Sequence, residues 1–314
     1  MPQSGTREVA HEITVRACAA DVYEFIAGVA NWPRIFPPTV HVEHLEQSAT
    51  EERIRIWATA NGEAKNWVSR RTLDREALRI EFRQEVSTPP VAAMGGTWII
   101  EPLSAGECRI RLLHDYRAVD DDQAGLAWID EAVDRNSRSE LAALKMNVEL
   151  AAAGADLLLS FEDSVRVEGS AKDVYDFLNE AQHWQERLPH VARVDFQETS
   201  PGLQLLEMDT RTKDGSTHTT KSVRVCFPDE RIVYKQITLP ALMTLHTGRW
   251  ELVEDGDGVT VTSQHTVVIN PDRITEVLGA EADLARAREF VRNALGANSR
   301  ATLGLAKDHA EGLR

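Results

Sequence analysis

The chain has 314 residues, a length that fits two domains of ordinary size, each with its own hydrophobic core. It carries 50 acidic and 35 basic side chains, a formal net charge of −15 that argues against nucleic acid as a partner and favours a soluble, cytoplasmic protein. The three cysteines are scattered and include no Cys-x-x-Cys pair, which argues against a disulfide framework and a zinc site. The polar start over residues 1–7 argues against a signal peptide, and the lack of an apolar run of about 20 residues argues against a membrane span.

The first half of the chain predicts a strand, short helices, a run of strands and a long helix. Residues 11–17 alternate as a half-buried strand does, and residues 22–29 form a helix that ends at Asn31-Trp32-Pro33. Turn signals then separate strand-like runs at 40–45, 53–59, 66–72, 78–84, 96–101 and 109–119. Residues 123–152 complete the half as a helix whose apolar side chains recur at helical spacing.

The second half repeats these features about 152 positions later. The motif Asp21-Val22-Tyr23-Glu24-Phe25 returns as Asp173-Val174-Tyr175-Asp176-Phe177, Gly96-Thr97-Trp98 returns as Gly248-Arg249-Trp250, and Asn136-Ser137-Arg138 returns, at a slightly longer offset, as Asn298-Ser299-Arg300. A period of this length indicates tandem duplication of a whole domain. We therefore predict domains at 1–152 and 153–314, joined by small residues at 151–155.

Each half predicts an α+β domain. The second half has strand-like runs at 191–198, 203–210, 217–224, 231–236, 247–252 and 259–269, and a long helix at 281–311. A long amphipathic helix after a meander of antiparallel strands most simply lies across the concave face of a curved sheet, because both must bury one apolar face. A cavity is expected between them.

Three segments of the first half resemble a known family. Asn31-Trp32-Pro33-Arg34-Ile35-Phe36, Asn66-Trp67-Val68-Ser69-Arg70-Arg71 and the aromatic residue of Gly96-Thr97-Trp98 are similar to the aromatase/cyclases of bacterial type II polyketide synthases, and the duplication is similar to their di-domain subclass. The resemblance implies a tandem duplication of a START-like helix-grip domain, a curved antiparallel sheet wrapped around a long C-terminal helix. It also implies antibiotic biosynthesis as the setting.

The activity implied by the resemblance is cofactor-free. The substrate would be a poly-β-ketone bound to an acyl carrier protein and already reduced at one ketone. The enzyme would direct aldol closure between carbons seven and twelve, and then the dehydration that makes the first ring aromatic. Orientation, one proton acceptor and one oxyanion stabiliser suffice for such chemistry, since methylenes between two carbonyls are already acidic.

The candidate catalytic residues are Arg71, Arg224, His218 and His246. The family match places Trp67 and Arg71 in the pocket, and Arg224 matches Arg71 after a one-residue shift. A guanidinium cannot act as a base near neutral pH, but it can hold a carbonyl or stabilise an enolate, whereas histidine moves protons readily. The alternatives are a surface position for each arginine and a structural, hydrogen-bonded role for each histidine.

Further side chains are expected to point inward and bind substrate. Alternating strand residues from 67 to 71 and from 218 to 224 give polar inner faces, which favour a ligand-lined cavity over a dry core. The tryptophans have core packing as their alternative, and Trp57 and Trp128 are assigned to packing alone. The expected binding residues are Trp32, Phe36, Trp67, Ser69, Met94, Trp98, His114, Trp184, His190, Thr220, Ser222, Trp250 and Gln264.

Two observations limit these assignments. Several single-domain members of the family carry a tyrosine where this chain has Thr39 and Val191, so a phenolic acid is lacking there and its proton-transfer role falls to another group or to water. No metal-ligand spacing, Ser-His-Asp set or phosphate-binding glycine loop is present in the sequence, so no metal or other cofactor is expected. The alternative function is a non-catalytic START-like carrier of an apolar or polyketide ligand, which the two matched arginines disfavour.

Overall fold

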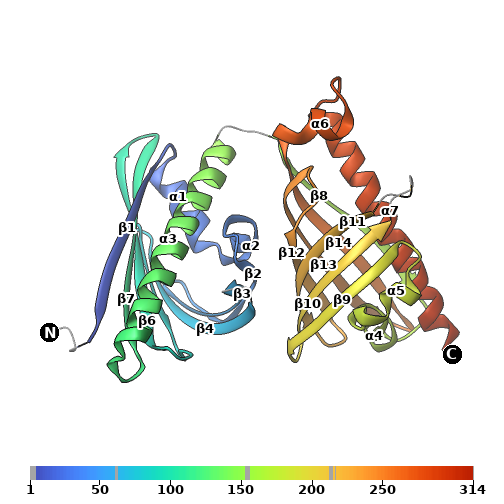
Figure 1. Cartoon of the computed structure of the whole chain (residues 1–314), viewed down its shortest axis with the longest axis horizontal. Coiled ribbons are helices and arrows are strands. Elements are labelled where there is room, and N and C mark those ends of the chain that lie inside the picture. The colour runs from blue at the N-terminus through green and yellow to red at the C-terminus, as the bar shows by residue number, and fades with distance from the viewer. Residues whose placement is uncertain (1–4, 61–62, 153–155, 212–214, 216, 314) are drawn as a thin grey trace. The chain divides into compact units, whose positions relative to one another are not determined.

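The computed structural model describes residues 5–60, 63–152, 156–211, 215 and 217–313. The chain forms two compact units, residues 1–155 and 156–314, and each has its own seven-stranded antiparallel sheet and long C-terminal helix (Figure 1). We call them the N-terminal and C-terminal domains. The predicted α+β fold class, a tandem duplication, is confirmed. Residues 153–155 of the expected linker lie outside the described residues.

The N-terminal domain follows the predicted order of elements. Its strands are β1 (Arg7–Val15), β2 (Thr39–Gln47), β3 (Glu51–Ala60), β4 (Glu63–Asp74), β5 (Arg79–Gln84), β6 (Val91–Ser104) and β7 (Glu107–Ala118). Its helices are α1 (Ala19–Ala27), α2 (Trp32–Ile35) and α3 (Gln123–Ala152), with single 3-10 turns at η1 (Val29–Asn31) and η2 (Val119–Asp121).

The C-terminal domain repeats this order with one addition. Its strands are β8 (Leu158–Val167), β9 (Val191–Ser200), β10 (Leu203–Arg211), β11 (Thr217–Phe227), β12 (Arg231–Thr238), β13 (Met243–Asp255) and β14 (Gly258–Ile269). Its helices are α4 (Ala171–Asn179), η3 (Ala181–His183), α5 (Trp184–Arg187), η4 (Pro271–Arg273), α6 (Ile274–Leu278) and α7 (Leu284–Gly312). Helix α6 has no counterpart between β7 and α3, which explains the longer offset of the second Asn-Ser-Arg motif.

The strand order places the long helix against the sheet. Consecutive strands pair from β2 to β7, and β1 pairs with β7 at the far end of the sheet; β8 to β14 repeat this arrangement. Helix α3 buries a stripe that includes Ile129, Val133, Leu141, Leu144 and Val148 at helical spacing, and it lies across the sheet in Figure 1. The interior of each domain is therefore bounded by strand side chains on one side and by one helix face on the other.

Local details differ from the sequence-based expectation. Helix α1 begins at Ala19, and Trp32 opens the short helix α2 where the sequence predicted a helix end. Pro33 fits the first turn of α2 because the missing N–H has no partner there in any helix. Trp57 is buried as predicted, but Trp128 is 46% exposed, so its assignment to packing is wrong.

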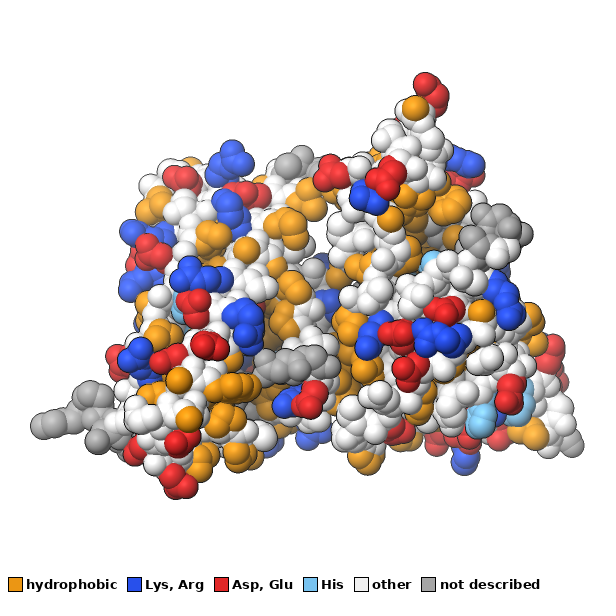
Figure 2. All heavy atoms as spheres, viewed as in Figure 1, with side chains coloured by type: hydrophobic (Ala, Val, Ile, Leu, Met, Phe, Trp, Pro, Cys, Tyr) orange, Lys and Arg blue, Asp and Glu red, His pale blue; other side chains and the backbone are white. Residues whose placement is uncertain are grey.

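The surface carries charges of both signs. Figure 2 shows basic and acidic side chains interleaved over both domains, and many form ion pairs, such as Arg138 with Asp134 on α3. None of the described helices combines the length and apolar character that crossing a bilayer requires.

Candidate functional site

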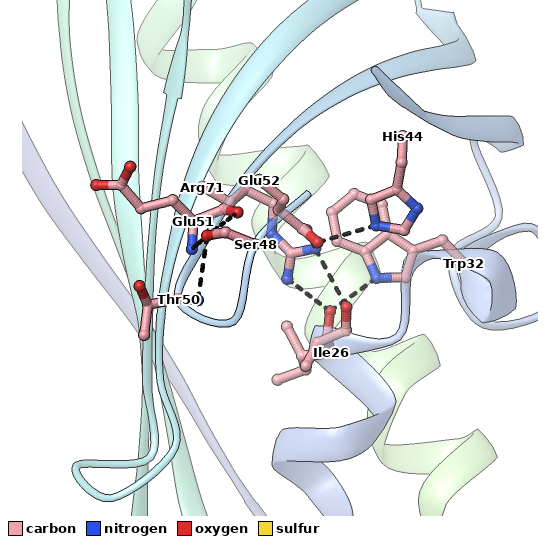
Figure 3. A network of polar contacts seen from close by, with 9 residues as sticks. Ile26, Trp32, His44, Ser48, Thr50, Glu51, Glu52 and Arg71 are labelled. Carbon is pink, nitrogen blue, oxygen red and sulfur yellow. Dashed lines mark hydrogen bonds and ion pairs between the residues drawn. The ribbon is translucent and has the colours of Figure 1, made fainter. Parts of the chain in front are cut away.

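Arg71 on β4 is buried inside the N-terminal domain but is bound to protein groups (Figure 3). Its Nη1 donates to a carboxylate oxygen of Glu52 and, at 3.3 Å, to the carbonyl of Ala27, while its Nη2 donates to the carbonyl of Ile26 at 2.9 Å. The guanidinium also stacks on the Trp32 ring, 4.9 Å from the ring centroid. Arg71 therefore ties the C-terminal end of α1 to the sheet, where a cation complements the helix dipole.

Glu52 neutralises this arginine. Both side chains are almost fully buried, at 1% and 2% exposed, and Glu52 also contacts Nε2 of His44 at 2.9 Å. Burial lowers the pKa of Arg71 to about 10, a shift that Glu52 opposes, so the guanidinium stays charged at neutral pH. Its charge is compensated by a neighbouring side chain rather than available to a ligand.

Arg224 occupies the same place in the C-terminal domain without a carboxylate. It lies opposite Gln204 on the paired strand, as Arg71 lies opposite Glu52. Its Nη2 donates to the carbonyl of Leu178 at 2.6 Å, and its guanidinium stacks on Trp184 at 5.1 Å. Its Nη1 is buried and has no hydrogen-bond partner in the described part of the chain.

The C-terminal domain encloses a cavity of about 350 Å³ between its sheet and α7, and Arg224 lines it. The wall combines apolar side chains with a few polar groups, as ligand sites usually do. Eight residues expected to be catalytic or to bind substrate line this cavity: Trp184, His190, His218, Thr220, Ser222, Arg224, His246 and Trp250.

Gln264 differs from the expectation. Its amide nitrogen donates to the hydroxyls of Ser160 and Thr266, outside the cavity. Its neighbour His265 lines the cavity instead, because adjacent residues of a strand point to opposite faces.

A chain of hydrogen bonds connects His246 to the long helix. Nε2 of His246 lies 2.9 Å from Nδ1 of His265, and the Tyr234 hydroxyl lies 3.1 Å from the same nitrogen. Nε2 of His265 lies 2.6 Å from the hydroxyl of Ser299 on α7, and the hydroxyl of Ser263 lies within 3.3 Å. We call these five residues the histidine relay.

The contacts of the histidine relay are compatible with either tautomer of His265, since each of its ring nitrogens can donate or accept. In the tautomer with the proton on Nε2, facing Ser299, Nδ1 of His265 accepts from Nε2 of His246. Nδ1 of His246 is then a bare acceptor. This Nδ1 is buried and has no hydrogen-bond partner among the described residues.

Burial sets the charge state of the relay. It lowers the pKa of His265 to about 4, and it holds the pKa of His246 well below its ordinary value, with His265 adding to the shift. Both imidazoles are therefore neutral near pH 7. The cavity thus combines a cationic donor at Arg224 with a neutral nitrogen acceptor at His246.

The stability of the C-terminal domain is expected to fall in mild acid. The unfolded chain protonates His265 near its ordinary pKa of 6.5, whereas the folded domain resists protonation down to about 4. Because the unfolded state then binds more protons, stability is lost as the pH falls through this range. Thermal unfolding at pH 7 and pH 5 measures the loss, and His265→Gln should reduce the difference between the two melting temperatures. An equal melting temperature at both values would contradict the assignment.

The N-terminal domain retains only part of the histidine relay. His114 lies opposite Gly96 as His265 lies opposite Gly248, so the two histidines are equivalent. His114 keeps its serine, with Nδ1 3.5 Å from the Ser137 hydroxyl. The other three positions are apolar: Phe82, Met94 and Leu112 stand where the C-terminal domain has Tyr234, His246 and Ser263.

The remaining predicted residues of the N-terminal domain lie mainly in packed surroundings. Trp32 and Phe36 meet edge to face at 5.5 Å, and Phe36 lies 6.1 Å from Trp98 in the main core cluster. Trp67 packs at the edge of a smaller cluster with Trp32, and the Ser69 hydroxyl donates to the carbonyl of Arg83. Met94 packs beside Tyr116 and Val91 in a third cluster.

Sequence reasoning missed His265, Tyr234 and Ser299. Two signals could have found Ser299 and His265. The Asn-Ser-Arg repeat contains both Ser137 and Ser299, and the apolar alternation of β14 at Val259 and Val261 places His265, not Gln264, on the inner face. Among the described residues, no three His, Cys, Asp or Glu side chains form a group able to hold a metal ion.

Comparison with known proteins agrees with this architecture. Residues 6–149 and 159–311 each match the family model described as polyketide cyclase / dehydrase and lipid transport. A granaticin polyketide synthase bifunctional cyclase/dehydratase from Streptomyces virginiae is 55% identical and covers 94% of this chain and 97% of its own length.

Two solved structures extend the similarity over both domains. The di-domain aromatase/cyclase BexL of the BE-7585A biosynthetic pathway is 67% identical, with a TM-score of 0.91 over 97% of this chain and 99% of its own. The di-domain aromatase/cyclase StfQ of the steffimycin pathway is 37% identical, with a TM-score of 0.86 over 97% and 98%. The resemblance found in the sequence, the helix-grip fold and the expectation of an enzyme are confirmed. The chain belongs to the polyketide cyclase/dehydrase and lipid transport family, in its di-domain aromatase/cyclase form.

Proposed function

We propose that this chain is a polyketide aromatase/cyclase that closes and aromatises the first ring of a poly-β-ketone, and that the C-terminal cavity is where ring closure takes place. The observation that carries the proposal is a pair of buried, unpartnered nitrogens on residues that line that cavity, Nη1 of Arg224 and Nδ1 of His246. A buried polar atom without a partner lowers stability, so a site that keeps these two, together with Oε1 of Gln236, is suited to a ligand that completes their hydrogen bonds.

The two nitrogens have complementary roles in the proposed step. Nδ1 of His246 accepts a proton from a methylene between two carbonyls of the substrate, and Nη1 of Arg224 donates to the carbonyl oxygen on which negative charge develops. A neutral imidazole of low pKa is a weak base, but such methylenes are acidic enough to need no stronger one. The enolate carbon then attacks a second carbonyl to form the ring, the C=O electron pair moves to that oxygen, and the oxygen takes the proton back from His246 to give a β-hydroxy ketone.

The rest of the histidine relay positions the base. Tyr234 and Ser299 fix His265, and His265 accepts from Nε2 of His246, which favours positive charge on His246 once it is protonated. Trp184 and Trp250, both largely buried, provide flat walls that keep the polyketide chain folded and dry. We assign His190, His218, Thr220 and Ser222 to substrate binding in the same cavity.

The substrate is proposed as a chain reduced at one ketone and delivered by an acyl carrier protein, with closure between carbons seven and twelve. The relatives whose names specify polyketide synthases support a polyketide substrate. The carrier protein remains a proposed partner, and neither nucleic acid nor a membrane is assigned to the chain.

Replacing Arg224 with glutamine tests the proposal. Loss of one oxyanion donor is expected to lower the yield of correctly closed product about 100-fold and to divert the chain to spontaneously cyclised products. The measurement is product analysis by mass spectrometry after incubation with a minimal synthase, with and without a ketoreductase. Arg211→Gln, which removes an exposed arginine of β10, is the matched control.

The same experiment separates the enzyme from a carrier. A carrier would bind the polyketide without changing which rings form, so both Arg224→Gln and the wild-type chain would give the same product profile. That result would remove the catalytic assignment of the C-terminal cavity.

A further inference from the structure

Gln236 contributes a further unpartnered polar atom to the wall of the C-terminal cavity. It lies on β12 two residues after Tyr234, so the two side chains share the face of the strand that lines the cavity. Its Oε1 is buried and has no hydrogen-bond partner among the described residues. The ring closure proposed above uses nitrogens of Arg224 and His246 and leaves this oxygen without a role.

The N-terminal domain carries the same glutamine with a partner for its oxygen. Gln84 of β5 lies opposite Ser69 of β4, as Gln236 lies opposite Ser222 of β11, so the two glutamines are equivalent. Oε1 of Gln84 accepts a hydrogen bond from the hydroxyl of Ser87 at 3.3 Å. In this copy of the fold, the oxygen is satisfied by the protein itself.

The C-terminal domain lacks the group that would satisfy the equivalent oxygen. Leu239 stands three residues after Gln236, where the N-terminal domain has Ser87 three residues after Gln84. The side chain of Leu239 packs against an apolar cluster and has no hydrogen to donate. The acceptor has therefore been kept while its donor is missing, an arrangement that lowers stability unless a ligand supplies the donor.

The chemistry of the ligand decides which group can donate to this oxygen. A chain of ketones offers carbonyl oxygens, which only accept hydrogen bonds. Its enol form has a hydroxyl group, but that hydroxyl is already bound to the neighbouring carbonyl of the same molecule. A ketone reduced to a secondary alcohol instead offers a free O–H, which the amide oxygen of Gln236 can accept.

We propose that Gln236 is the residue by which the C-terminal cavity recognises a chain reduced at one ketone. Its Oε1 accepts from the new hydroxyl, while Arg224 holds a carbonyl oxygen of the same chain. This inference rests on the proposed function and names the specificity-determining residue of that site. A ketone in place of the alcohol would set one acceptor against another and leave both unsatisfied, so the same glutamine also disfavours the unreduced chain.

The test compares Gln236→Leu with the wild-type full chain on reduced and unreduced substrates. With the minimal synthase and a ketoreductase, we expect the yield of correctly closed product to fall about 10- to 100-fold, as for loss of one buried hydrogen bond to a substrate hydroxyl. Without the ketoreductase, the yield should stay the same or rise, since leucine does not oppose a ketone. Arg224→Gln, in contrast, should lower the yield from both substrates.

Gln84→Leu is the matched control. It removes the same side chain at the equivalent position, where the oxygen already has a partner within the protein, and it should leave the preference for the reduced chain unchanged. Thermal melts show that both variants fold. Gln236→Leu should not lower the melting temperature, because it replaces a buried acceptor that has no donor among the described residues.

A binding measurement separates this inference from the proposed catalysis. Calorimetric titration with the β-hydroxydecanoyl and β-ketodecanoyl thioesters of N-acetylcysteamine requires no reaction. The wild-type chain and Gln84→Leu should bind the hydroxy form about fivefold more tightly or better, and Gln236→Leu should bind both forms alike.

The outcomes are distinct. Equal affinity of the wild-type chain for the two thioesters would overturn the assignment of Gln236, as would a Gln236→Leu variant that keeps the preference or weakens both ligands equally. A chain that shows the binding preference while Arg224→Gln leaves its products unchanged would support the role of Gln236 and refute the proposed catalysis.

Discussion

Arg71→Ala is expected to lower the free energy of unfolding of the N-terminal domain by about 3–5 kcal/mol. The substitution leaves Glu52, 2% exposed, as a buried carboxylate without its cation, and it removes the donors that hold the carbonyls of Ile26 and Ala27 at the end of α1. A large part of the folded population should be lost. Hydrogen–deuterium exchange of β3 and β4, combined with urea denaturation, measures the change.

Two further variants make this result interpretable. Arg70→Ala removes the adjacent arginine, which is exposed and pairs with Glu85, and should change stability by no more than about 1 kcal/mol. The double variant Arg71→Met with Glu52→Leu removes both charges together and should recover much of the loss. If Arg71→Ala were as stable as Arg70→Ala, the structural role of the buried ion pair would be refuted.

His265→Gln is expected to reduce the rate of ring closure about 1000-fold, within the range of general acid–base catalysis. Glutamine can accept at its amide oxygen, but its flexible side chain does not hold an acceptor toward Tyr234 and His246 and a donor toward Ser299 as the rigid imidazole ring does. His246, the proposed base, would lose the ring nitrogen of His265 that keeps the proton of His246 on Nε2. Initial rates of product formation under single-turnover conditions measure the effect, since release of product does not contribute to them.

His218→Gln is the matched comparison within the same cavity. His218 lines the cavity, but within the described residues it belongs to no hydrogen-bond chain of the kind that connects His246 to α7. Its replacement should alter the apparent affinity for substrate more than the rate. A large loss of rate in His218→Gln, together with a small one in His265→Gln, would assign the base to His218 and contradict the histidine relay.

The fold could be predicted from sequence because its determinants are periodic. The repeat of about 152 residues and the alternation along the strands depend on which residues are apolar, and α3 was placed correctly at 123–152 on helical spacing alone. Pro33 was misjudged because a proline both ends a helix and fits the first turn of the next. Helix α6 is only five residues long and gives too short a pattern to detect.

The candidate site was only partly predictable because its chemistry depends on which side chains meet across neighbouring strands. The inward direction of Arg71 and Arg224 follows from alternation, and both are buried. Which of them is neutralised depends on the residue opposite on the next strand, Glu52 or Gln204, and that register is set by the turn between the strands rather than by either strand. The tautomers of His246 and His265 depend in the same way on Tyr234 of the neighbouring strand β12.

The exchange of Glu52 for Gln204 has an evolutionary consequence. After a duplication, two copies of one position are free to diverge under different selection. In the N-terminal domain the buried guanidinium of Arg71 pairs with Glu52, which stabilises the fold. In the C-terminal domain Nη1 of Arg224 has no hydrogen-bond partner among the described residues, which lowers stability but leaves a donor for a ligand. A single-domain ancestor must combine stability and reactivity in one pocket. In this chain the two requirements fall on two different domains.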